Sequence, residues 1–447
     1  MHVSETIVAV ATPAGRAGVG VVRVSGSKSL DIAGLITNLI NIKPRNAYYT
    51  NFFDIEKNLL DQGILIYFKA PNSFTGEDIV EFQCHGAPVV LDQLVHTCVL
   101  HGARLARPGE FSERAFLNDK IDLTQAEAIS DLINANSITS ARLAVRSLQG
   151  DFSKYINELN QKLLQLRLYV EAAIDFPEED LDFLNDGHVE NSLKELQETL
   201  AKIRISATQG VMVREGLTFV ITGRPNVGKS TLMNQLAGRD LAIVTDIAGT
   251  TRDLMRAEVT IDDLSVHIID TAGLRESSDP IEQEGIRRAW DEVNKADGIL
   301  WIMDLTAENV HECEHEQVIK NLSSNIPVIR IWNKIDRTDI NPHILDNDIY
   351  LSAHLGLGLN LLKNKMKSIV GYQPTEGQFS ARRRHLNALD QARDFLIAGQ
   401  VQLIENRAGE LLAEDLRQAH LSLCEITGEF TSDDLLGTIF SHFCIGK

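Results

Sequence analysis

The sequence predicts a multidomain α/β plus α protein: a small α+β domain comes first, and an α/β domain is inserted into a helical domain. Three observations predict this architecture. The chain of 447 residues is too long for one ordinary domain. Residues 214–370 alternate strand-like and helix-like patterns, which is typical of a mostly parallel sheet covered by helices. The flanking segments, 119–213 and 371–447, are helical in pattern, and domain insertion is tolerated where chain ends lie close together.

Residues 1–118 alternate short β-rich runs with loops and one helical stretch. The runs are TIVAVAT, GVVRVSG, QGILIYF and DIVEFQC, and the helical stretch is VVLDQLVHTCVLHGA. This pattern predicts a small α+β domain. In the following segment, KELQETLAKIRI has apolar residues at helix spacing, and Pro177 separates two such helices.

The segment 214–370 contains six strand candidates punctuated by Gly and Asn-Pro loops. They are LTFVIT, AEVTI, SVHIID, GILWIMD, PVIRIWN and DIYLSA. After residue 371 the helical patterns RRHLNALDQARDFLIAG and ELLAEDLRQAHLSLCEIT follow.

Composition indicates a soluble protein of a reducing compartment. A hydrophobic content of 44% is enough for real cores, the first residues lack the pattern of a signal peptide, and no run is long enough to cross a bilayer. The scattered cysteines form no CxxC pair, which favours a cytoplasmic location without a disulfide framework. These cysteines are Cys84, Cys98, Cys313, Cys424 and Cys444.

The formal charge of −19 argues against unspecific coating of nucleic acid, including DNA. Any RNA contact therefore has to come from a partner or from a local patch such as Arg382-Arg383-Arg384-His385. The same four residues are also typical of a solvated helix start.

Residues 223–231, GRPNVGKST, match the phosphate-binding motif G-x-x-x-x-G-K-[ST] in full. The motif follows a strand candidate and opens a helix candidate, which is the setting it requires. Gly223 and Gly228 let the backbone curl so that successive N–H groups face phosphate oxygens. Lys229 is expected to reach the β- and γ-phosphates, and the Ser230 hydroxyl to ligate Mg²⁺.

Two further motifs follow in the order found in GTPases. In DIAGTTRD, Thr250 and Thr251 are expected to bring a hydroxyl to Mg²⁺ and a backbone N–H to the γ-phosphate. Asp270 ends a strand candidate and suits a place behind the metal's direct ligands. The Gly273 N–H suits the γ-phosphate.

Recognition of guanine is predicted from Asn333-Lys334-Ile335-Asp336. The Asp336 carboxylate can accept hydrogen bonds from N1–H and N2–H₂ of guanine, and adenine lacks this pair of donors. Ser352-Ala353-His354 is expected to complete the pocket through backbone contacts. The ordered set of motifs therefore predicts GTP as the nucleotide.

Residues 270–274 read D-T-A-G-L, and the fifth residue raises a question about hydrolysis. Ras-like GTPases resemble this stretch but have a glutamine there, which orients the attacking water. Leu274 can neither donate nor accept a hydrogen bond. Either the protein does not hydrolyse GTP, or another residue positions the water.

Three other patterns favour structural interpretations. The segment 311–315 matches H-E-x-x-H of zinc proteases, but it lies between two strand candidates, where a covering helix is expected. Residues 15–20, GRAGVG, miss the spacing of a dinucleotide-binding motif and favour a turn between strands. For Cys84-His85, a buried thiol beside a polar loop histidine is favoured over a catalytic pair.

The motifs GRPNVGKST, DIAGTTRD, DTAGLRE and NKID, the stretch RPGEFSERAFLNDKIDLTQAEAISDLI and the tail FCIGK together resemble the MnmE (TrmE) tRNA-modification GTPase family. The resemblance covers essentially the whole chain. It implies an N-terminal folate-binding α+β domain, a discontinuous helical domain and an inserted Ras-like P-loop G domain. It also implies a homodimer formed through the N-terminal domain and a heterotetramer with the FAD-dependent partner MnmG, acting on the wobble uridine of certain tRNAs. A 5-formyl- or methylene-tetrahydrofolate is implied as the one-carbon source.

The resemblance also implies residues for the folate and for the chemistry. Folate contacts fall on Arg23, Glu81, Lys120 and Lys447, where cations suit the tail carboxylates and a carboxylate suits the pterin edge. Cys444 matches the family's tail cysteine, for which a redox or nucleophilic role and a structural role are both open.

K⁺ is the activating cation that the resemblance implies. Its ligands would be the Asn226 side chain and carbonyls of the 245–250 loop, and Glu282 would position the water, with Glu284 as a rival. The implied K⁺ ligands are Asn226, Thr245, Ile247 and Thr250, the Mg²⁺ ligands are Ser230 and Thr251, and the catalytic residues are Glu282, Lys229, Thr251 and Cys444. Motifs and resemblance together give the nucleotide and cation contacts as Asn226, Val227, Gly228, Lys229, Ser230, Thr231, Thr245, Asp246, Ile247, Ala248, Gly249, Thr250, Thr251, Asp270, Thr271, Ala272, Gly273, Asn333, Lys334, Asp336, Ser352, Ala353 and His354.

Two alternatives stay open. A ribosome-assembly GTPase shares the aliphatic residue after DTAG, but it usually has an added RNA-binding module, and the C-terminal helices show no KH-type GxxG segment. A folate-dependent enzyme with a vestigial GTPase is disfavoured by the intact Lys229, Ser230 and Asp270.

Overall fold

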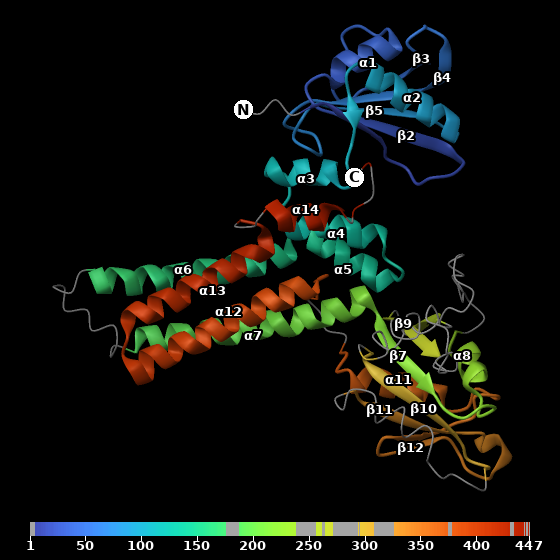
Figure 1. Ribbon diagram of the computed structural model, residues 1–447, viewed down its shortest axis with the longest axis vertical. Coiled ribbons are helices and arrows are strands. Elements are labelled where there is room, and N and C mark those ends of the chain that lie inside the picture. Colours follow the sequence, from blue (N-terminus) through green and yellow to red (C-terminus); the bar gives the residue numbers. More distant parts are fainter. Residues whose placement is uncertain are drawn as a thin grey trace, which may run out of the picture. The chain divides into compact units, whose positions relative to one another are not determined.

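The structure is a computed structural model and divides the chain into two compact units. The first unit comprises residues 1–133, 147–199 and 388–447, and the second comprises 134–146 and 200–387 (Figure 1). The residues that the structure describes are 5–175, 187–237, 256–261, 264–270, 294, 296–307, 326–373, 378–429, 433–441, 443 and 446. The predicted domain boundaries at 118/119, 213/214 and 370/371 stay predictions.

A six-stranded sheet forms the N-terminal part of the first unit. Its order is β3-β4-β5-β2-β1-β6, and only the β1–β6 pair is parallel. The strands are β1 (Ile7–Val10), β2 (Ala17–Ser25), β3 (Ala47–Phe53), β4 (Leu59–Phe68), β5 (Ile79–Gly86) and β6 (Arg104–Leu105). Alternate residues such as Val22, Val24 and Phe82 are buried with residues of α1 (Ser29–Thr37) and α2 (Pro88–Leu100), as expected for a sheet with one covered face. The predicted α+β pattern is confirmed here.

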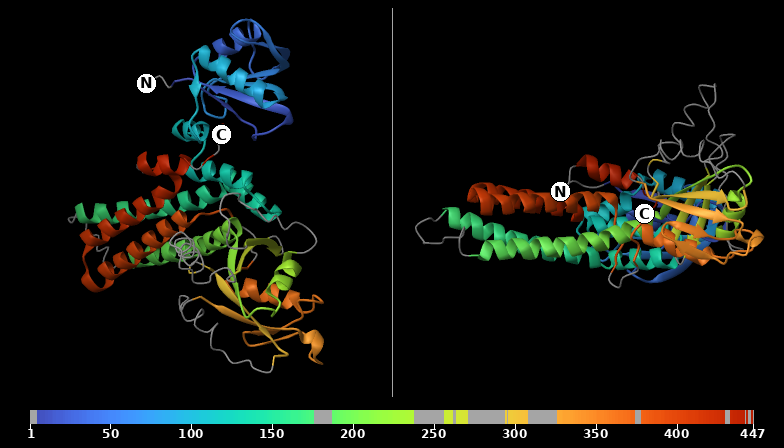
Figure 2. Two further views of the ribbon diagram at one scale, coloured as in Figure 1. Left: turned by 45° about the vertical axis from the view of Figure 1, so that its right-hand side comes forward. Right: turned by 90° about the horizontal axis from the view of Figure 1, so that it is seen from below.

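Long helices form the rest of the first unit. They are α3 (Glu110–Leu117), α4 (Leu123–Ile133), α6 (Asp151–Asp175), the start of α7 (His188–Glu215), most of α12 (Arg383–Val401), α13 (Gly409–Thr427) and α14 (Asp433–Ser441), with a π-helical turn at Gln402–Asn406. Helix α13 packs along α6, and α14 packs on α3 (Figure 2). The predicted helix spacing is confirmed because Leu193, Leu196 and Leu200 of α7 are all buried. Pro177 lies outside the described residues.

A seven-stranded sheet forms the core of the second unit, in the order β12-β13-β11-β10-β7-β9-β8. Its strands are β7 (Leu217–Thr222), β8 (Arg256–Ile261), β9 (Leu264–Asp270), β10 (Gly298–Asp304), β11 (Val328–Asn333), β12 (His343–Leu345) and β13 (Asp348–Tyr350). All pairs are parallel except those of the edge strands β8 and β12, so the predicted mostly parallel sheet is confirmed. Helices α8 (Lys229–Ala237) and α11 (Leu359–Ile369) pack on it, and Leu143 of α5 (Ile138–Leu148) joins its core.

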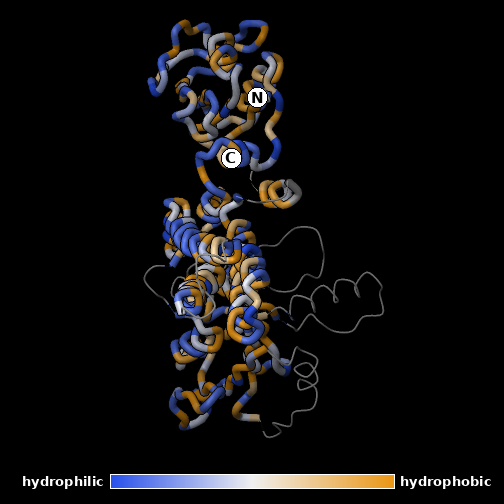
Figure 3. Tube along the Cα trace, turned by 90° about the vertical axis from the view of Figure 1, so that its left-hand side faces the viewer, coloured by the Kyte–Doolittle hydropathy of each residue, from blue (hydrophilic) through white to orange (hydrophobic). Residues whose placement is uncertain are grey.

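Two local predictions need correction. The GRAGVG stretch is not a turn throughout, because β2 already begins at Ala17 and includes Gly18 and Gly20. In DIYLSA only residues 348–350 are strand, and Ser352 forms an isolated bridge with Leu357. Among the described residues, no helix combines the length and apolar character needed to cross a membrane, and the helical segments mix apolar and polar residues (Figure 3).

Candidate functional sites

The phosphate loop lies between β7 and α8, as the motif predicts. Gly223 has a φ of 151°, and a Cβ placed there would lie 2.3 Å from the Ile302 carbonyl oxygen of β10. Gly228 has a φ of 103°, and a Cβ there would lie 2.4 Å from Asn333 Nδ2. Both positions therefore require glycine for backbone conformation and for space. Lys229 Nζ donates to the carbonyls of Gly223 and Arg224 at 2.8 and 3.1 Å, so its ammonium lies over the loop.

Ser230 and Thr231 are exposed in the first turn of α8. Their hydroxyls are therefore accessible at a helix N-terminus, where an anion and its metal are favoured. Asp270, at the end of β9, is 5% exposed and pairs in register with Ile221 of β7. The sheet thus brings Asp270 beside the strand that leads into the phosphate loop.

Asn333 joins the guanine-recognition segment to the phosphate loop. This side chain is 3% exposed. Its Nδ2 donates to the Val227 carbonyl at 2.7 Å, and its Oδ1 accepts from the Ala353 amide at 2.8 Å. One amide thereby fixes three segments whose positions in sequence are far apart. These two bonds tie the phosphate loop, the end of β11 and the segment at Ala353 to one another.

The residues predicted to surround the base lie together. The Ser352 hydroxyl donates to Asp336 Oδ1 and also accepts from the Leu355 amide, so it orients the carboxylate. Ala353 is buried and His354 is exposed. Asp336 is exposed, so its carboxylate is an accessible acceptor beside Ser352.

Asp304 is a residue of this site that the sequence analysis did not identify. It is the last residue of β10, and Lys334 Nζ lies 2.5 Å from its Oδ2. Lys334 Nζ also donates to the Asn226 carbonyl at 3.0 Å. One feature of the sequence could have identified Asp304. It is an acidic residue at the carboxyl end of a strand candidate, and this strand lies between the two strands that lead into the nucleotide motifs.

Several predicted site residues lie outside the described residues. They are Thr245, Asp246, Ile247, Ala248, Gly249, Thr250, Thr251, Thr271, Ala272, Gly273, Glu282, Glu284, Cys444 and Lys447, together with Leu274 and the H-E-x-x-H segment 311–315. Their predicted roles stay predictions.

In the first unit, the structure brings together the predicted folate contacts Arg23 and Glu81. These residues face each other across β2 and β5, and their side chains pair, with Arg23 Nε 2.9 Å from Glu81 Oε1. The guanidinium also lies over the rings of Phe74 and Phe111, 5.7 and 5.8 Å from their centroids. Sequence analysis did not single out either aromatic ring. The paired charges thus lie between the partly buried ring of Phe74 and the fully buried ring of Phe111.

Gly446 lies against the N-terminal sheet, and Lys120 lies against the loop before β5. A Cβ placed at Gly446 would lie 2.2 Å from the Val10 carbonyl oxygen, so Gly446 lies against β1, the neighbour of β2. The Lys120 side chain packs at Gly76, where a Cβ would lie 3.1 Å from Lys120 Cε. The described tail residue is thus close to the strand pair that contains Arg23.

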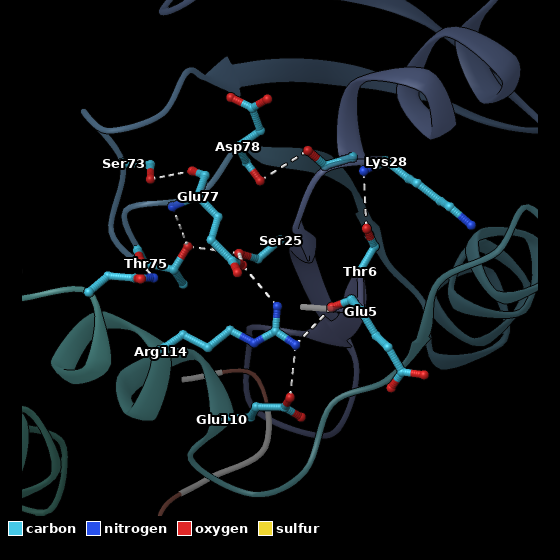
Figure 4. Close-up of polar contacts among 12 residues, drawn as sticks. Glu5, Thr6, Ser25, Lys28, Ser73, Thr75, Glu77, Asp78, Glu110 and Arg114 are labelled. Carbon is cyan, nitrogen blue, oxygen red and sulfur yellow. Dashed lines mark hydrogen bonds and ion pairs between the residues drawn. The ribbon is translucent and has the colours of Figure 1, made fainter. Parts of the chain in front are cut away.

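A buried ion network lies at the junction of α3 with the loop before β5 (Figure 4). Arg114 donates to Glu77 Oε2 at 2.9 Å, Glu110 Oε1 at 3.0 Å and the Glu5 carbonyl at 2.8 Å. Burial raises the pKa of Glu110, but hydrogen bonds from Arg104, the Arg107 amide and Arg114 lower it more, to about 2. Glu110 is therefore a buried carboxylate that stays charged, and it anchors α3 to the N-terminal sheet.

The structure does not support Cys84 and His85 as a nucleophile–base pair. Cys84 is buried, and burial together with the Asp61 charge raises its pKa to about 11. His85 lies on strand β5 rather than in a loop, and its Nδ1 is 2.9 Å from Asp61 Oδ1. Neighbouring residues of a strand point to opposite faces, which separates the thiol from the imidazole.

The predicted basic patch at 382–385 is not a continuous exposed surface. His385 is 2% exposed, and its Nδ1 accepts from the Arg382 amide at 3.0 Å. Arg383 pairs with Glu215 at 2.9 Å. The alternative interpretation, a helix start, is therefore the better description.

Two family models match the chain: the MnmE helical domain over residues 123–444, and the N-terminus of the GTP-binding protein TrmE over residues 6–120. The tRNA modification GTPase MnmE of Legionella pneumophila (strain Paris) is 59% identical over 443 residues, covering 99% of both chains. The tRNA modification GTPase MnmE of Hydrogenovibrio crunogenus is 55% identical over 449 residues, again covering 99% of both. Among solved structures, a variant of Era from Aquifex aeolicus with GDP and AlF₄⁻ is 27% identical, with a TM-score of 0.27. The match covers 41% of this chain and 67% of that one.

Proposed function

The chain belongs to the MnmE family of tRNA modification GTPases, and from this premise we propose that it is a K⁺-dependent GTPase acting with MnmG on tRNA. The pair would add an aminomethyl-type group, such as carboxymethylaminomethyl, at C5 of the wobble uridine at tRNA position 34. Hydrolysis of GTP would drive a conformational change rather than supply the chemistry of the uridine.

The observation that carries the GTPase part of the proposal is the Asn333 side chain. It ties the phosphate loop to the guanine-recognition segment through Val227 and Ala353. Around it, Lys229 and Ser230 would bind the phosphates and Mg²⁺, and Asp336 would accept from the guanine edge. When bound, Mg²⁺ neutralises negative charge between the phosphates.

Potassium is proposed as the activating cation because Leu274 cannot position water and Asn226 offers an oxygen at the phosphate loop. The Asn226 side chain is exposed, and its backbone has a left-handed φ of 65°. Its side-chain oxygen suits a hard cation. Carbonyls of Thr245, Ile247 and Thr250 would complete the cation site, and Glu282 would hold the water.

For the N-terminal sheet we propose a tetrahydrofolate site, with a 5-formyl or methylene group as the one-carbon source. The Arg23–Glu81 pair beside the partly buried Phe74 ring supports this proposal, since folates combine carboxylates with flat rings. Lys120 and Lys447 would contribute further cations, and Cys444 a thiol. A cytoplasmic homodimer that assembles with the FAD-dependent MnmG into a heterotetramer is part of the same proposal.

The potassium assignment is tested by measuring GTP turnover of the full chain in K⁺ and in Na⁺. We expect much faster turnover in K⁺, and we expect Asn226→Ala to abolish the difference. Equal rates of the wild-type protein in both salts would refute the assignment. For the water, Glu282→Ala should retain GTP affinity and lose hydrolysis; if Glu284→Ala does this instead, Glu282 is the wrong residue.

The tRNA assignment is tested in cells that lack this chain. Unmodified wobble uridine, measured by nucleoside mass spectrometry, is the expected result. Normally modified uridine together with accumulated ribosome precursors would instead indicate the alternative, a GTPase of ribosome assembly.

A further inference from the structure

Asp304 ends the strand that lies between the two halves of the nucleotide site. The sheet order places β10 between β7, which leads into the phosphate loop, and β11, which leads into Asn333-Lys334. Asp304 is the register partner of Asn333 on β11. Ligands of open parallel sheets bind outside the carboxyl ends of the strands. A side chain at the end of β10 can therefore act on both loops at once.

The Asp304 carboxylate holds the Lys334 ammonium against the phosphate loop. Lys334 Nζ is 2.5 Å from Asp304 Oδ2 and donates to the Asn226 carbonyl at 3.0 Å. On its other side, Asp304 Oδ1 accepts from the amide and the hydroxyl of Thr306, at 3.0 and 2.7 Å. Thr306 thus orients the carboxylate that orients the lysine.

The ion pair is shielded from solvent and charged. The side chains of Lys334 and Asp304 are 21% and 19% exposed. Burial raises the pKa of Asp304, but hydrogen bonds from Lys334 and Thr306 outweigh this effect, so the pKa lies below its ordinary value. Hydrogen bonds between charged groups are roughly twice as strong as neutral ones. The contact is therefore a charge-assisted bond between the ends of β10 and β11.

The two loop residues that this contact joins both have left-handed backbone conformations. The φ angle is 73° at Lys334 and 65° at Asn226. Lysine disfavours this region and stays in it where surrounding contacts impose it, whereas asparagine tolerates it. The bond from Lys334 to the Asn226 carbonyl is a contact between two such positions, and Asp304 fixes its donor.

We propose that Asp304 is a positioning residue of the nucleotide site: through Lys334 it fixes the phosphate loop against the guanine-recognition segment and slows the release of guanine nucleotide. In this role Asp304 acts on loop geometry and does not touch the nucleotide. The proposal needs only the binding of guanine nucleotide, and it is independent of the potassium and folate assignments.

The test measures release of fluorescent mant-GDP from the full chain after addition of excess GDP. Asp304→Asn keeps the size of the side chain and removes its charge. We expect release about tenfold faster than from the wild-type protein, equivalent to about 1.4 kcal/mol. A release rate within about twofold of the wild-type rate would overturn the proposal, because loss of even one ordinary hydrogen bond should change the rate by more than this.

Asp348→Asn is a matched control in the same sheet. The Asp348 carboxylate is 16% exposed and accepts from Arg330 and Trp332. Its partner Arg330 lies near the amino end of β11, away from the Lys334 end. Release from this variant should match wild type. Equal acceleration by Asp348→Asn and Asp304→Asn would show a general weakening of the sheet and contradict the role of Asp304.

A second background separates positioning from ordinary structural support. Lys334→Met keeps the apolar stem and should itself accelerate release. Because Asp304 acts through Lys334, adding Asp304→Asn to Lys334→Met should leave the release rate unchanged. Additive effects of the two substitutions would refute the mechanism.

Thr306→Val is a milder variant that leaves both charges of the ion pair in place. It removes one hydrogen bond to Asp304 and should accelerate release about threefold. Thermal unfolding identifies variants that fail to fold. If Asp304→Asn fails to fold, the Thr306→Val result decides, and an unchanged release rate would overturn the proposal.

Discussion

Replacing Glu110 by glutamine tests whether the buried ion network holds α3 to the N-terminal sheet. The Glu110 side chain is 3% exposed and accepts from Arg104 at 2.6 and 2.8 Å and from Arg114 at 3.0 Å. Glutamine keeps the size and one acceptor oxygen but removes the charge. Arg114, whose side chain is 9% exposed, then lacks part of its compensation. Loss of one partner of a buried pair typically costs about 3–5 kcal/mol.

The pKa of Glu110 gives a second magnitude and a pH dependence. Its decrease from an ordinary 4.5 to about 2 corresponds to about 3 kcal/mol of stabilisation. Because the folded-state pKa is lowered, the contribution is fully present above about pH 5 and is lost as the pH falls through the folded-state value. About 2 kcal/mol of it should be gone at pH 3.

Hydrogen exchange followed by mass spectrometry measures this effect locally, which suits a chain with two units that need not unfold in one step. In Glu110→Gln, the amides of α3 should exchange about 100-fold faster than in the wild-type protein at pH 7. The difference should shrink at pH 3, because Glu110 is mostly protonated there in the unfolded chain, so the charged network stabilises the folded wild-type protein less. Exchange rates that are equal at pH 7, or a difference that stays constant down to pH 3, would refute the reasoning.

Glu414→Gln is the control for this experiment. Hydrogen bonds from Arg417 and Gln418 lower the pKa of Glu414 to about 2, as in Glu110, but the Glu414 side chain is 51% exposed. Ion pairs in solvent contribute little because water screens them. Exchange in α13 should therefore be unchanged, and a large effect there would mean that burial is not what distinguishes Glu110.

Three further predictions concern the nucleotide site and the thiols. Gly228→Ala should abolish binding of mant-GDP while the circular dichroism spectrum stays unchanged. The new Cβ would lie 2.4 Å from Asn333 Nδ2 and would push this side chain away. Retained binding would contradict this close approach. Asp336→Asn should weaken GTP binding about 10- to 100-fold. Xanthosine triphosphate should gain affinity for this variant, because xanthine has a carbonyl where guanine has N2–H₂. Equal losses of affinity for both nucleotides would exclude direct base recognition by Asp336. Burial raises the pKa of Cys84 to about 11 and that of Cys424 to about 12. Both thiols should therefore resist iodoacetamide at neutral pH in the native protein, as measured by intact-mass spectrometry. Rapid labelling of either thiol would contradict its burial.

Local patterns were sufficient to predict most of the regular structure. The candidates LTFVIT and GILWIMD coincide with β7 and β10, because buried parallel strands read as continuous apolar runs. The spacing of Leu193, Leu196 and Leu200 predicts the buried face of α7. The edge strand β12 was missed because its three residues are all exposed and carry no apolar pattern.

The polar contacts that complete the sites could not be predicted from such patterns. Arg114 meets Glu77 and the Glu5 carbonyl across 37 and 109 residues of sequence, and each of these residues alone resembles an ordinary surface charge. Burial of Arg114 and Glu110 depends on how α3 packs on the sheet, which local spacing does not determine. The same holds for His385, which is buried although both interpretations of the sequence, a basic patch and a solvated helix start, made it exposed.

The order of strands in the sheet, rather than their order in the sequence, explains why Asp304 lies beside Asn333. The motifs predict that β7 leads into the phosphate loop and β11 into the guanine-recognition segment, and parallel strands present their carboxyl ends at one edge. Once β10 is placed between them, its last residue must lie between the two loops, and an acid there is the register partner of Asn333, next to the lysine of NKID. Base recognition and phosphate binding are then held together by side chains of the sheet edge. We therefore expect a substitution at that edge to affect both halves of the site, and one at the opposite edge, such as Asp348→Asn, to affect neither.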